Sequence, residues 1–139
     1  MIKSLQVGIE HEIKFVVPQS KTVPKLYPEL EEFGAMPEVF ATGYLVGLLE
    51  WTCMQAVNPY LDFPHELTLG TRINVSHEAA TPPGLEVTVR VKLTKVDGRR
   101  LEFDVEANDG IDIISRGTHE RFIVDAKRFS EKVASKVKE

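Results

Sequence analysis

The sequence ATGYLVGLLEWTCMQAVNPYL, residues 41–61, decides the fold of this chain. It is the only long apolar segment in which hydrophobic side chains recur with the three- and four-residue spacing of a helix. Thr42 is a suitable N-cap residue, and Pro59 predicts that the helix ends near Val57 or Asn58. A helix that is apolar on most sides is normally surrounded by other elements. We therefore expect a buried central helix that contains a single carboxylate.

After this helix the hydrophobic pattern changes to alternation, which is typical of half-buried strands. The Asp-Gly pairs at 97–98 and 109–110 are hairpin signals. The alternation slips between Ile113 and Ile114, as a β-bulge would cause. Four strands are predicted, at residues 67–79, 85–94, 101–108 and 111–124.

The remaining segments flank this pattern. Residues 5–17 predict a first strand with an irregularity around His11, and residues 27–36 predict a short helix or turn that ends at Gly34. Residues 126–139 predict a polar, lysine-rich helix or a frayed end. Because sequential hairpins imply an antiparallel sheet with one apolar face, we expect an α+β fold in which the sheet curls around the helix. Residues 1–139 should form a single domain.

Composition and charge exclude several classes of protein. Hydrophobic content is 42%, charged content is 27% and net charge is −4, without a basic block that would indicate nucleic-acid binding. The apolar helix is too short for a convincing membrane span, which needs about 20 residues. The first residues lack the apolar core of a signal peptide. A single cysteine, Cys53, fits the interior of a cytoplasmic protein. No nucleotide-binding or metal-binding motif is present, so we expect no cofactor.

Three polar residues are expected where the fold is apolar. Glu50 in the apolar helix either lies on a solvent-exposed stripe of the helix, pairs with a buried Arg or His, or takes part in catalysis. His77, on the apolar parity of the 67–79 strand, is either a hydrogen-bonded core residue or a base that faces the same interior as Glu50. Thr42 either caps the helix or helps its first-turn amides to meet a developing negative oxygen.

Spacing limits how these residues act together. Thr42 and Glu50 are eight residues apart, which is about 12 Å along a helix axis. Both cannot readily contact one carbonyl group from the same helix. Two antiparallel helices related by a twofold axis would bring Thr42 of one chain close to Glu50 of the other. We therefore expect a homodimer with active sites at the subunit interface.

Three blocks of the sequence resemble one known family. FATGYLVGLLEW (residues 40–51), LGTRINVSHEAATPPG (69–84) and GTHER (117–121) look like the corresponding segments of the fluoroacetyl-CoA thioesterases, which have the hotdog fold. The similarity runs roughly from Val7 to Phe129. It implies an antiparallel sheet wrapped around a long central helix. It also implies hydrolysis of a short acyl-CoA, with no cofactor beyond the CoA of the substrate.

The resemblance further implies roles for individual residues. A Thr, a Glu and a His form the catalytic set of the family, and they map onto Thr42, Glu50 and His77. A glycine whose backbone lies near the substrate carbonyl maps onto Gly70, and an arginine of the last strand maps onto Arg121.

The 27–36 segment carries two further candidates, Phe33 and Met36. They either pack against the core or belong to a lid over a pocket beside the helix N-terminus. The resemblance implies a lid, in which Met36 occupies the position of a gating Phe. This difference leaves the selectivity for fluoroacetyl groups open.

Two mechanisms fit these residues. Glu50 attacks the thioester carbonyl to form a mixed anhydride that His77-activated water hydrolyses, or Glu50 or His77 acts on water directly as a general base. Two other functions remain open: a non-catalytic acyl-CoA or acyl-carrier binding module, and a hotdog hydratase or dehydratase. The CoA nucleotide is expected at the surface near Arg99, Arg100 or Lys92.

Overall fold

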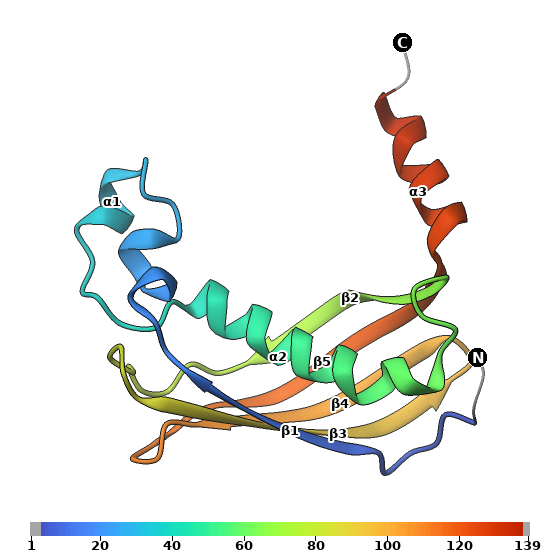
Figure 1. Ribbon diagram of the computed structural model, residues 1–139, viewed down its shortest axis with the longest axis horizontal. Helices are drawn as coiled ribbons and strands as arrows, with labels where there is room; N and C mark the ends of the chain where they lie inside the picture. Colours follow the sequence, from blue (N-terminus) through green and yellow to red (C-terminus); the bar gives the residue numbers. More distant parts are fainter. Residues whose placement is uncertain (1–3, 138–139) are drawn as a thin grey trace.

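The computed structural model describes residues 4–137 and confirms the predicted central helix. Helix α2 spans Thr42–Val57, and a short 3-10 turn, η3 (Asn58–Tyr60), follows it and contains Pro59. The helix lies across one face of a sheet (Figure 1). Its buried side chains are Leu45, Leu48, Leu49, Thr52, Cys53, Ala56 and Val57.

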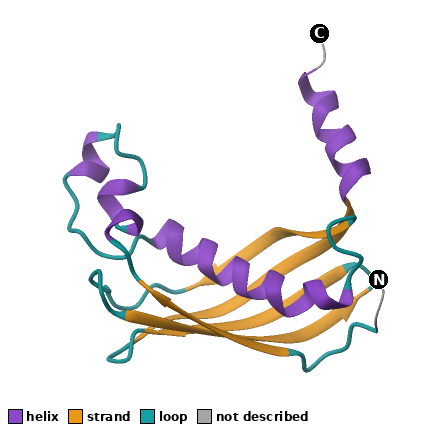
Figure 2. Ribbon diagram, in the orientation of Figure 1, coloured by secondary structure: helices purple, strands orange, loops and turns teal. Residues whose placement is uncertain are grey.

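Five antiparallel strands form a curved sheet against α2 within the described residues (Figure 2). They are β1 (Glu10–Val16), β2 (Glu66–Val75), β3 (Glu86–Asp97), β4 (Arg100–Asn108) and β5 (Ile113–Asp125). Their order in the sheet is β1-β3-β4-β5-β2, so β1 and β2 are the edges. Alternate side chains of β3 and β4 are buried under the helix: Val87, Val89, Val91, Leu93, Leu101, Phe103, Val105 and Ala107. The predicted α+β architecture is confirmed.

Tight turns join β3 to β4 and β4 to β5 where the Asp-Gly pairs predicted them. Asp97 pairs with Arg100 across the first turn, and Gly98 adopts a φ of 62° there, which costs a glycine little. In the second turn, the side chain of Asp109 accepts the backbone N–H groups of residues 111 and 112.

The predicted bulge in β5 is also confirmed. Asn108 of β4 pairs with Ile113, whereas the preceding Ala107 pairs with Ser115. Ile114 is therefore the extra residue, which explains why both Ile114 and Ser115 are buried.

The edge strands differ from the sequence-based expectation. β1 begins at Glu10 rather than at residue 5, and it pairs with β3 in unbroken register through His11. The predicted irregularity at His11 is therefore wrong. β2 ends at Val75, so His77 lies in the loop that follows and not on a strand.

A bulge in β2 changes which side chains face the helix. Gly70 pairs with Arg121 and Arg72 pairs with Glu120, so Thr71 is an extra residue. Paired residues of adjacent strands point to the same side of a sheet. Gly70 therefore faces α2 together with Arg121, and Leu69 points outward. The prediction that residues 69, 71, 73, 75 and 77 share one face is therefore wrong for residues 69 and 71, which lie before the register shift is complete.

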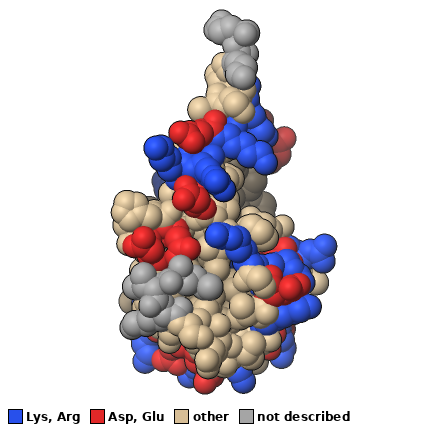
Figure 3. Space-filling model, turned by 90° about the vertical axis from the view of Figure 1, so that its right-hand side faces the viewer, with Lys and Arg blue, Asp and Glu red and all other residues tan. Residues whose placement is uncertain are grey.

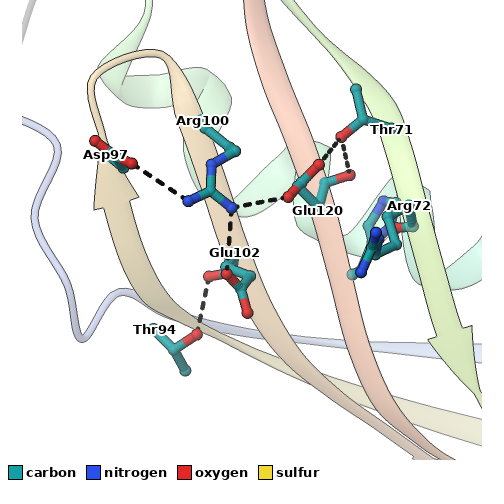
Figure 4. Close-up of polar contacts among 8 residues, drawn as sticks. Thr71, Arg72, Thr94, Asp97, Arg100, Glu102 and Glu120 are labelled. Atoms are coloured by element: carbon teal, nitrogen blue, oxygen red, sulfur yellow. Dashed lines mark hydrogen bonds and ion pairs between the residues drawn. The ribbon is translucent and has the colours of Figure 1, made fainter.

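A polar network on the outer face surrounds this bulge (Figure 4). The Thr71 hydroxyl lies 2.7 Å from the Glu120 carboxylate and also contacts the Glu120 backbone. Arg100 binds the same carboxylate at 3.0 Å and approaches Asp97 and Glu102. Arg100, an expected contact for the CoA nucleotide, is thus already engaged with three carboxylates.

Short helical segments stand at the N-terminal end of α2 (Figure 1). They are η1 (Gln19–Lys21), η2 (Val23–Lys25) and α1 (Glu31–Gly34). The predicted end of the 27–36 turn at Gly34 is confirmed. We refer to residues 23–36 as the lid segment.

The chain leaves the opposite end of the sheet as α3 (Ala126–Ala134), followed by η4 (Ser135–Val137) (Figure 1). The predicted C-terminal helix is confirmed up to this point, and residues 138–139 of that prediction lie outside the described range. Acidic and basic side chains are interspersed on this end of the molecule (Figure 3). Within residues 4–137, no helix combines the length and the hydropathy of a membrane span.

Candidate active site

The first of two polar clusters lies at the N-terminus of α2 and joins Thr42 to His77. Thr42 Oγ1 and His77 Nδ1 are 2.7 Å apart, and the ring tautomer decides which of them donates. Ala41, not Thr42, occupies the N-cap position, and no side chain caps this end. The predicted capping role of Thr42 is therefore wrong, because its hydroxyl contacts an imidazole 35 residues away.

Backbone contacts fix the loop that carries His77. The N–H groups of Ser76 and Glu78 donate to the carbonyl oxygens of Arg116 and Ile114 in β5, at 3.0 and 2.7 Å. The carboxylate of Glu78 also binds the Arg116 guanidinium through two bonds of 2.8 Å. This pairing, together with the Ser76 hydroxyl, lowers the pKa of Glu78 to about 2. The loop therefore holds His77 in place although it is not part of β2.

The other nitrogen of the His77 ring, Nε2, is not bonded to Thr42. Nε2 is buried and has no hydrogen-bond partner among residues 4–137. Burial lowers the pKa of His77, and the Ala79 backbone opposes this effect in part. An imidazole that is neutral near pH 7 and has one unpaired nitrogen can exchange a proton with a bound molecule.

The second cluster lies midway along α2 and centres on Arg121 of β5. Arg121 Nη1 donates to Glu50 Oε2 at 2.9 Å. Its Nε and Nη2 donate to the hydroxyl and the carbonyl of Thr68, each at 2.8 Å. The Arg121 side chain is 1% exposed, whereas that of Glu50 is 36% exposed. Glu50 is therefore paired with a buried arginine, and its Oε1 has no hydrogen bond among the described residues.

Gly70 allows β2 to approach this carboxylate. A Cβ at this position would lie 2.5 Å from Glu50 Oε2 and 3.4 Å from Arg121 Nη1. Any larger residue would therefore displace the carboxylate or its partner. A cavity of about 310 Å³ opens at this point and is lined by Val46, Glu50, Gly70, Thr71, Arg72, Ile73 and His119.

The two clusters are separate within one chain. Neither Thr42 nor His77 lines the Glu50 cavity, and no hydrogen bond within residues 4–137 connects the clusters. The expectation that Glu50 and His77 face one common interior is therefore wrong for a single chain. Their separation follows from the positions of Thr42 and Glu50, which are eight residues apart in one helix, or about 12 Å along its axis.

The lid segment covers the first turn of α2. The Leu26 side chain lies against Gly43, where a Cβ would approach it to 3.3 Å. Phe33 contacts Tyr27, with ring centroids 5.6 Å apart, and Met36 is 49% exposed. The lid segment therefore lies next to Thr42, and the Met36 side chain is exposed to solvent. Contacts of Phe33 and Met36 with substrate stay a prediction.

A larger, mostly apolar cavity of about 450 Å³ lies on the opposite side of α2 and includes none of the predicted site residues. It is lined by Phe15, Lys21, Phe40, Tyr44, Gly47, Leu48 and Trp51. Cys53 is buried as predicted, and burial raises the pKa of its thiol to about 12. Within residues 4–137, no group of His, Cys, Asp and Glu side chains is arranged to hold a metal ion.

The sequence analysis did not single out the histidine of the Glu50 cavity. His119 is 2% exposed, and its Nε2 lies 3.0 Å from Arg121 Nη1. Alternate residues of a strand face the same side. The two-residue spacing of His119 and Arg121 within GTHER therefore could have indicated it.

The chain is similar to known thioesterases in sequence and in fold. Residues 17–127 match the family model described as fluoroacetyl-CoA-specific thioesterase. The fluoroacetyl-CoA thioesterase of Streptantibioticus cattleyicolor is 53% identical over 136 residues, which cover 98% of this chain and 97% of that protein. A solved structure of the fluoroacetyl-CoA thioesterase FlK has a TM-score of 0.93 and 53% identity, covering 96% of this chain and 98% of that chain. A thioesterase-superfamily protein from Thermus thermophilus is 29% identical, with a TM-score of 0.81 and coverage of 97% and 94%. These structures confirm the predicted hotdog fold.

Proposed function

Because the chain belongs to the fluoroacetyl-CoA-specific thioesterase family and is a thioester hydrolase, we propose that it hydrolyses a short-chain acyl-CoA at a site built from Thr42, Glu50 and His77. The observation that carries this proposal is the Glu50 carboxylate, held by the buried Arg121 at the wall of a cavity beside Gly70. A variant of FlK has been solved in complex with fluoroacetate and CoA, which supports a short acyl-CoA as the substrate class. The enzyme assignment favours this reading over a binding module without catalysis.

In the first of two routes, Glu50 is the nucleophile. Arg121 occupies Oε2, which leaves Oε1 to attack the thioester carbonyl carbon. The carbon–sulfur bond then breaks, CoA leaves as the thiolate, which takes a proton from solvent, and the acyl group remains on Glu50 as a mixed anhydride. His77 takes a proton from water, and that water cleaves the anhydride to give the free acid and the regenerated carboxylate.

In the second route, Glu50 or His77 removes a proton from water, which attacks the thioester directly. Thr42 and the first-turn amides of α2 orient or stabilise the carbonyl oxygen in both routes, because the positive end of a helix favours a developing anion. No acyl-enzyme forms in this second route.

A single turnover in ¹⁸O-labelled water separates the routes. An anhydride that is opened at the Glu50 carbonyl leaves ¹⁸O in the protein, whereas direct attack by water labels only the acid. Borohydride added during turnover provides an independent test, because it reduces an anhydride and marks Glu50 whichever carbonyl water attacks. If mass spectrometry finds neither mark on Glu50, the anhydride route is wrong.

The active site is completed by a second copy of the chain. β2 is an edge strand, and the Glu50 cavity opens along it with Ile73 39% exposed. A partner that lies along this edge with its α2 antiparallel brings Thr42 of the partner subunit toward Glu50. The separation of the two clusters within one chain supports this homodimer.

Mixed dimers test the shared site. A Thr42→Ala chain and a Glu50→Ala chain are each inactive, but a dimer of the two contains one site with both residues intact. If chains exchange at random, the mixture should recover about a quarter of the wild-type activity. Absence of any recovery, with mixed dimers verified by mass spectrometry, would contradict a site shared between subunits.

The acyl group is identified by thiol release from a panel that includes fluoroacetyl-, acetyl- and aryl-acetyl-CoA. Met is flexible and fills space without the fixed shape of an aromatic ring. We therefore propose that Met36 admits several short acyl groups. Met36→Phe should narrow this range, and an unchanged ranking of substrates would show that the lid does not select the acyl group. A cytoplasmic location stays a prediction.

A further inference from the structure

The hydrogen bonds of His119 determine its protonation state. His119 Nδ1 lies 2.7 Å from the carbonyl oxygen of Arg72, which can only accept, so Nδ1 carries the proton. His119 Nε2 lies 3.0 Å from Arg121 Nη1, which can only donate, so Nε2 presents its lone pair. His119 is therefore a neutral imidazole in the Nδ1–H tautomer.

This tautomer makes Arg121 a bridge between His119 and the carboxylate. Arg121 Nη1 donates one hydrogen to His119 Nε2 and the other to Glu50 Oε2. Thr68 occupies the other side of the same guanidinium. Because His119 Nε2 accepts one hydrogen of Nη1, the other hydrogen of Nη1 points toward Glu50 Oε2.

We propose that His119 is a positioning residue for hydrolysis: it accepts a hydrogen bond from Arg121 and thereby fixes the Glu50 oxygen that Arg121 holds. The proposal rests on the proposed function of Glu50. His119 touches no reacting atom in this scheme, and it acts only through Arg121.

The surroundings of His119 keep it neutral. Burial lowers the pKa of His119; the Arg72 carbonyl opposes this effect, Arg121 adds to it, and Glu50 and Glu120 oppose it. An imidazolium would direct an N–H group at the Arg121 guanidinium across 3.0 Å. The Phe103 ring, whose centroid lies 6.4 Å from that of His119 in a stacked orientation, carries no charge.

Two conservative substitutions separate positioning from a merely structural role. In His119→Gln, the amide oxygen can replace Nε2 as the acceptor for Arg121, but the bond to the Arg72 carbonyl is weakened. In His119→Asn, the amide N–H can replace Nδ1 as the donor to Arg72, but Arg121 loses its acceptor. Positioning predicts that Asn lowers kcat by about tenfold to a hundredfold with little change in KM, and that Gln recovers most of this loss.

A structural role through the Arg72 carbonyl predicts the opposite order. The proposal is therefore overturned if Asn retains kcat, or if Gln loses as much as Asn does. Urea unfolding of both variants shows whether they are folded under the assay conditions. Thiol release by the wild type and by Glu50→Gln is measured alongside, so that a failure of the proposed function is recognised separately.

The wild-type tautomer gives a test that does not depend on activity. In ¹⁵N-labelled protein, the four histidines give long-range ¹H–¹⁵N patterns that distinguish Nδ1–H, Nε2–H and imidazolium. We expect one Nδ1–H pattern near neutral pH that disappears in His119→Gln. An Nε2–H or imidazolium pattern for His119 would overturn the proposal.

Discussion

The two polar clusters along α2 are built in opposite ways. Thr42 and His77 share one hydrogen bond at an open end of the helix, and His77 Nε2 has no partner among the described residues. Midway along the same helix, Arg121 is almost fully buried and bonds to Glu50, Thr68 and His119 at once. The first cluster is open and the second is closed.

This difference shows which part of the site already has its catalytic geometry within one chain. A carboxylate held by a saturated, buried guanidinium keeps one geometry and needs no reorganisation during the reaction. A hydroxyl–imidazole pair with an unpaired nitrogen can still adapt to a substrate or to a partner subunit. Changes in the closed cluster should therefore affect activity and stability together, and changes in the open cluster should affect activity more than stability.

The largest effect is expected for Glu50→Gln. The amide oxygen can still accept from Arg121, but the buried guanidinium loses its counter-charge, so the free energy of unfolding should fall, though by less than when the arginine itself is removed. The amide is neither a nucleophile nor a base, and kcat should fall by about a thousandfold or more. Thiol release and urea unfolding measure the two quantities, and Glu86→Gln on the exposed surface is the matched control. Retention of more than a tenth of the activity would contradict a chemical role for Glu50.

Arg121→Leu should cause the largest loss of stability. Removing one partner of a buried ion pair costs about 3–5 kcal/mol, and we expect about 2–3 kcal/mol here because Glu50 is 36% exposed. Arg90 is the matched control, since it binds Glu12 at only 2.6 Å but is 60% exposed. Arg90→Leu should cost clearly less stability than Arg121→Leu, because solvent screens an exposed ion pair. Equal losses for the two variants in urea unfolding would show that burial does not distinguish these arginines.

Gly70→Ala perturbs the closed cluster less than Arg121→Leu does. The added methyl group would lie 2.5 Å from Glu50 Oε2, and the carboxylate at the end of its side chain can move away. We expect kcat to fall by about tenfold to a hundredfold, with a change of less than about 1 kcal/mol in stability. Gly47→Ala is the control, because no atom lies within 4 Å of its added Cβ and alanine favours the helix. A fall in kcat that was equal in both variants would contradict a specific role for Gly70.

The elements with local signals were predictable from the sequence. The apolar run and Pro59 gave α2, strict alternation gave β3 and β4, and the double isoleucine gave the bulge at Ile114. Each of these depends on hydrophobic periodicity or on turn chemistry within a few residues. The Glu50 candidate came from the same source, because a polar residue within an apolar pattern is visible in the sequence. The strand parity that singled out His77 was wrong, since His77 lies in the loop after β2.

The geometry of the site was not predictable in the same way. The bulge at Thr71 follows Gly70, and a glycine within a strand is only a weak signal of a bulge. The side chain of Thr71 contacts Glu120 of the neighbouring strand, a residue 49 positions away. The capping role expected for Thr42 was lost to His77, a distant residue in sequence. Such pairings are decided by tertiary contacts, so a single sequence predicts the residues but not their partners.

The smallest effect, and the one that separates the clusters most directly, concerns pH. Burial lowers the pKa of His77 below its usual value of 6.5. If neutral His77 activates water, kcat/KM should decline at low pH with a midpoint below 6.5. The sign for stability is the same: the folded pKa lies below the unfolded value, so the contribution of His77 is complete above about pH 6.5 and is lost as the pH falls through the folded pKa. His119 also has a lowered pKa. His119→Gln is therefore the control that shows which histidine causes the acid limb, the decline of kcat/KM at low pH. A limb that persists in His119→Gln and disappears in His77→Gln belongs to the open cluster, whereas a limb above pH 6.5 would contradict the environment described for His77.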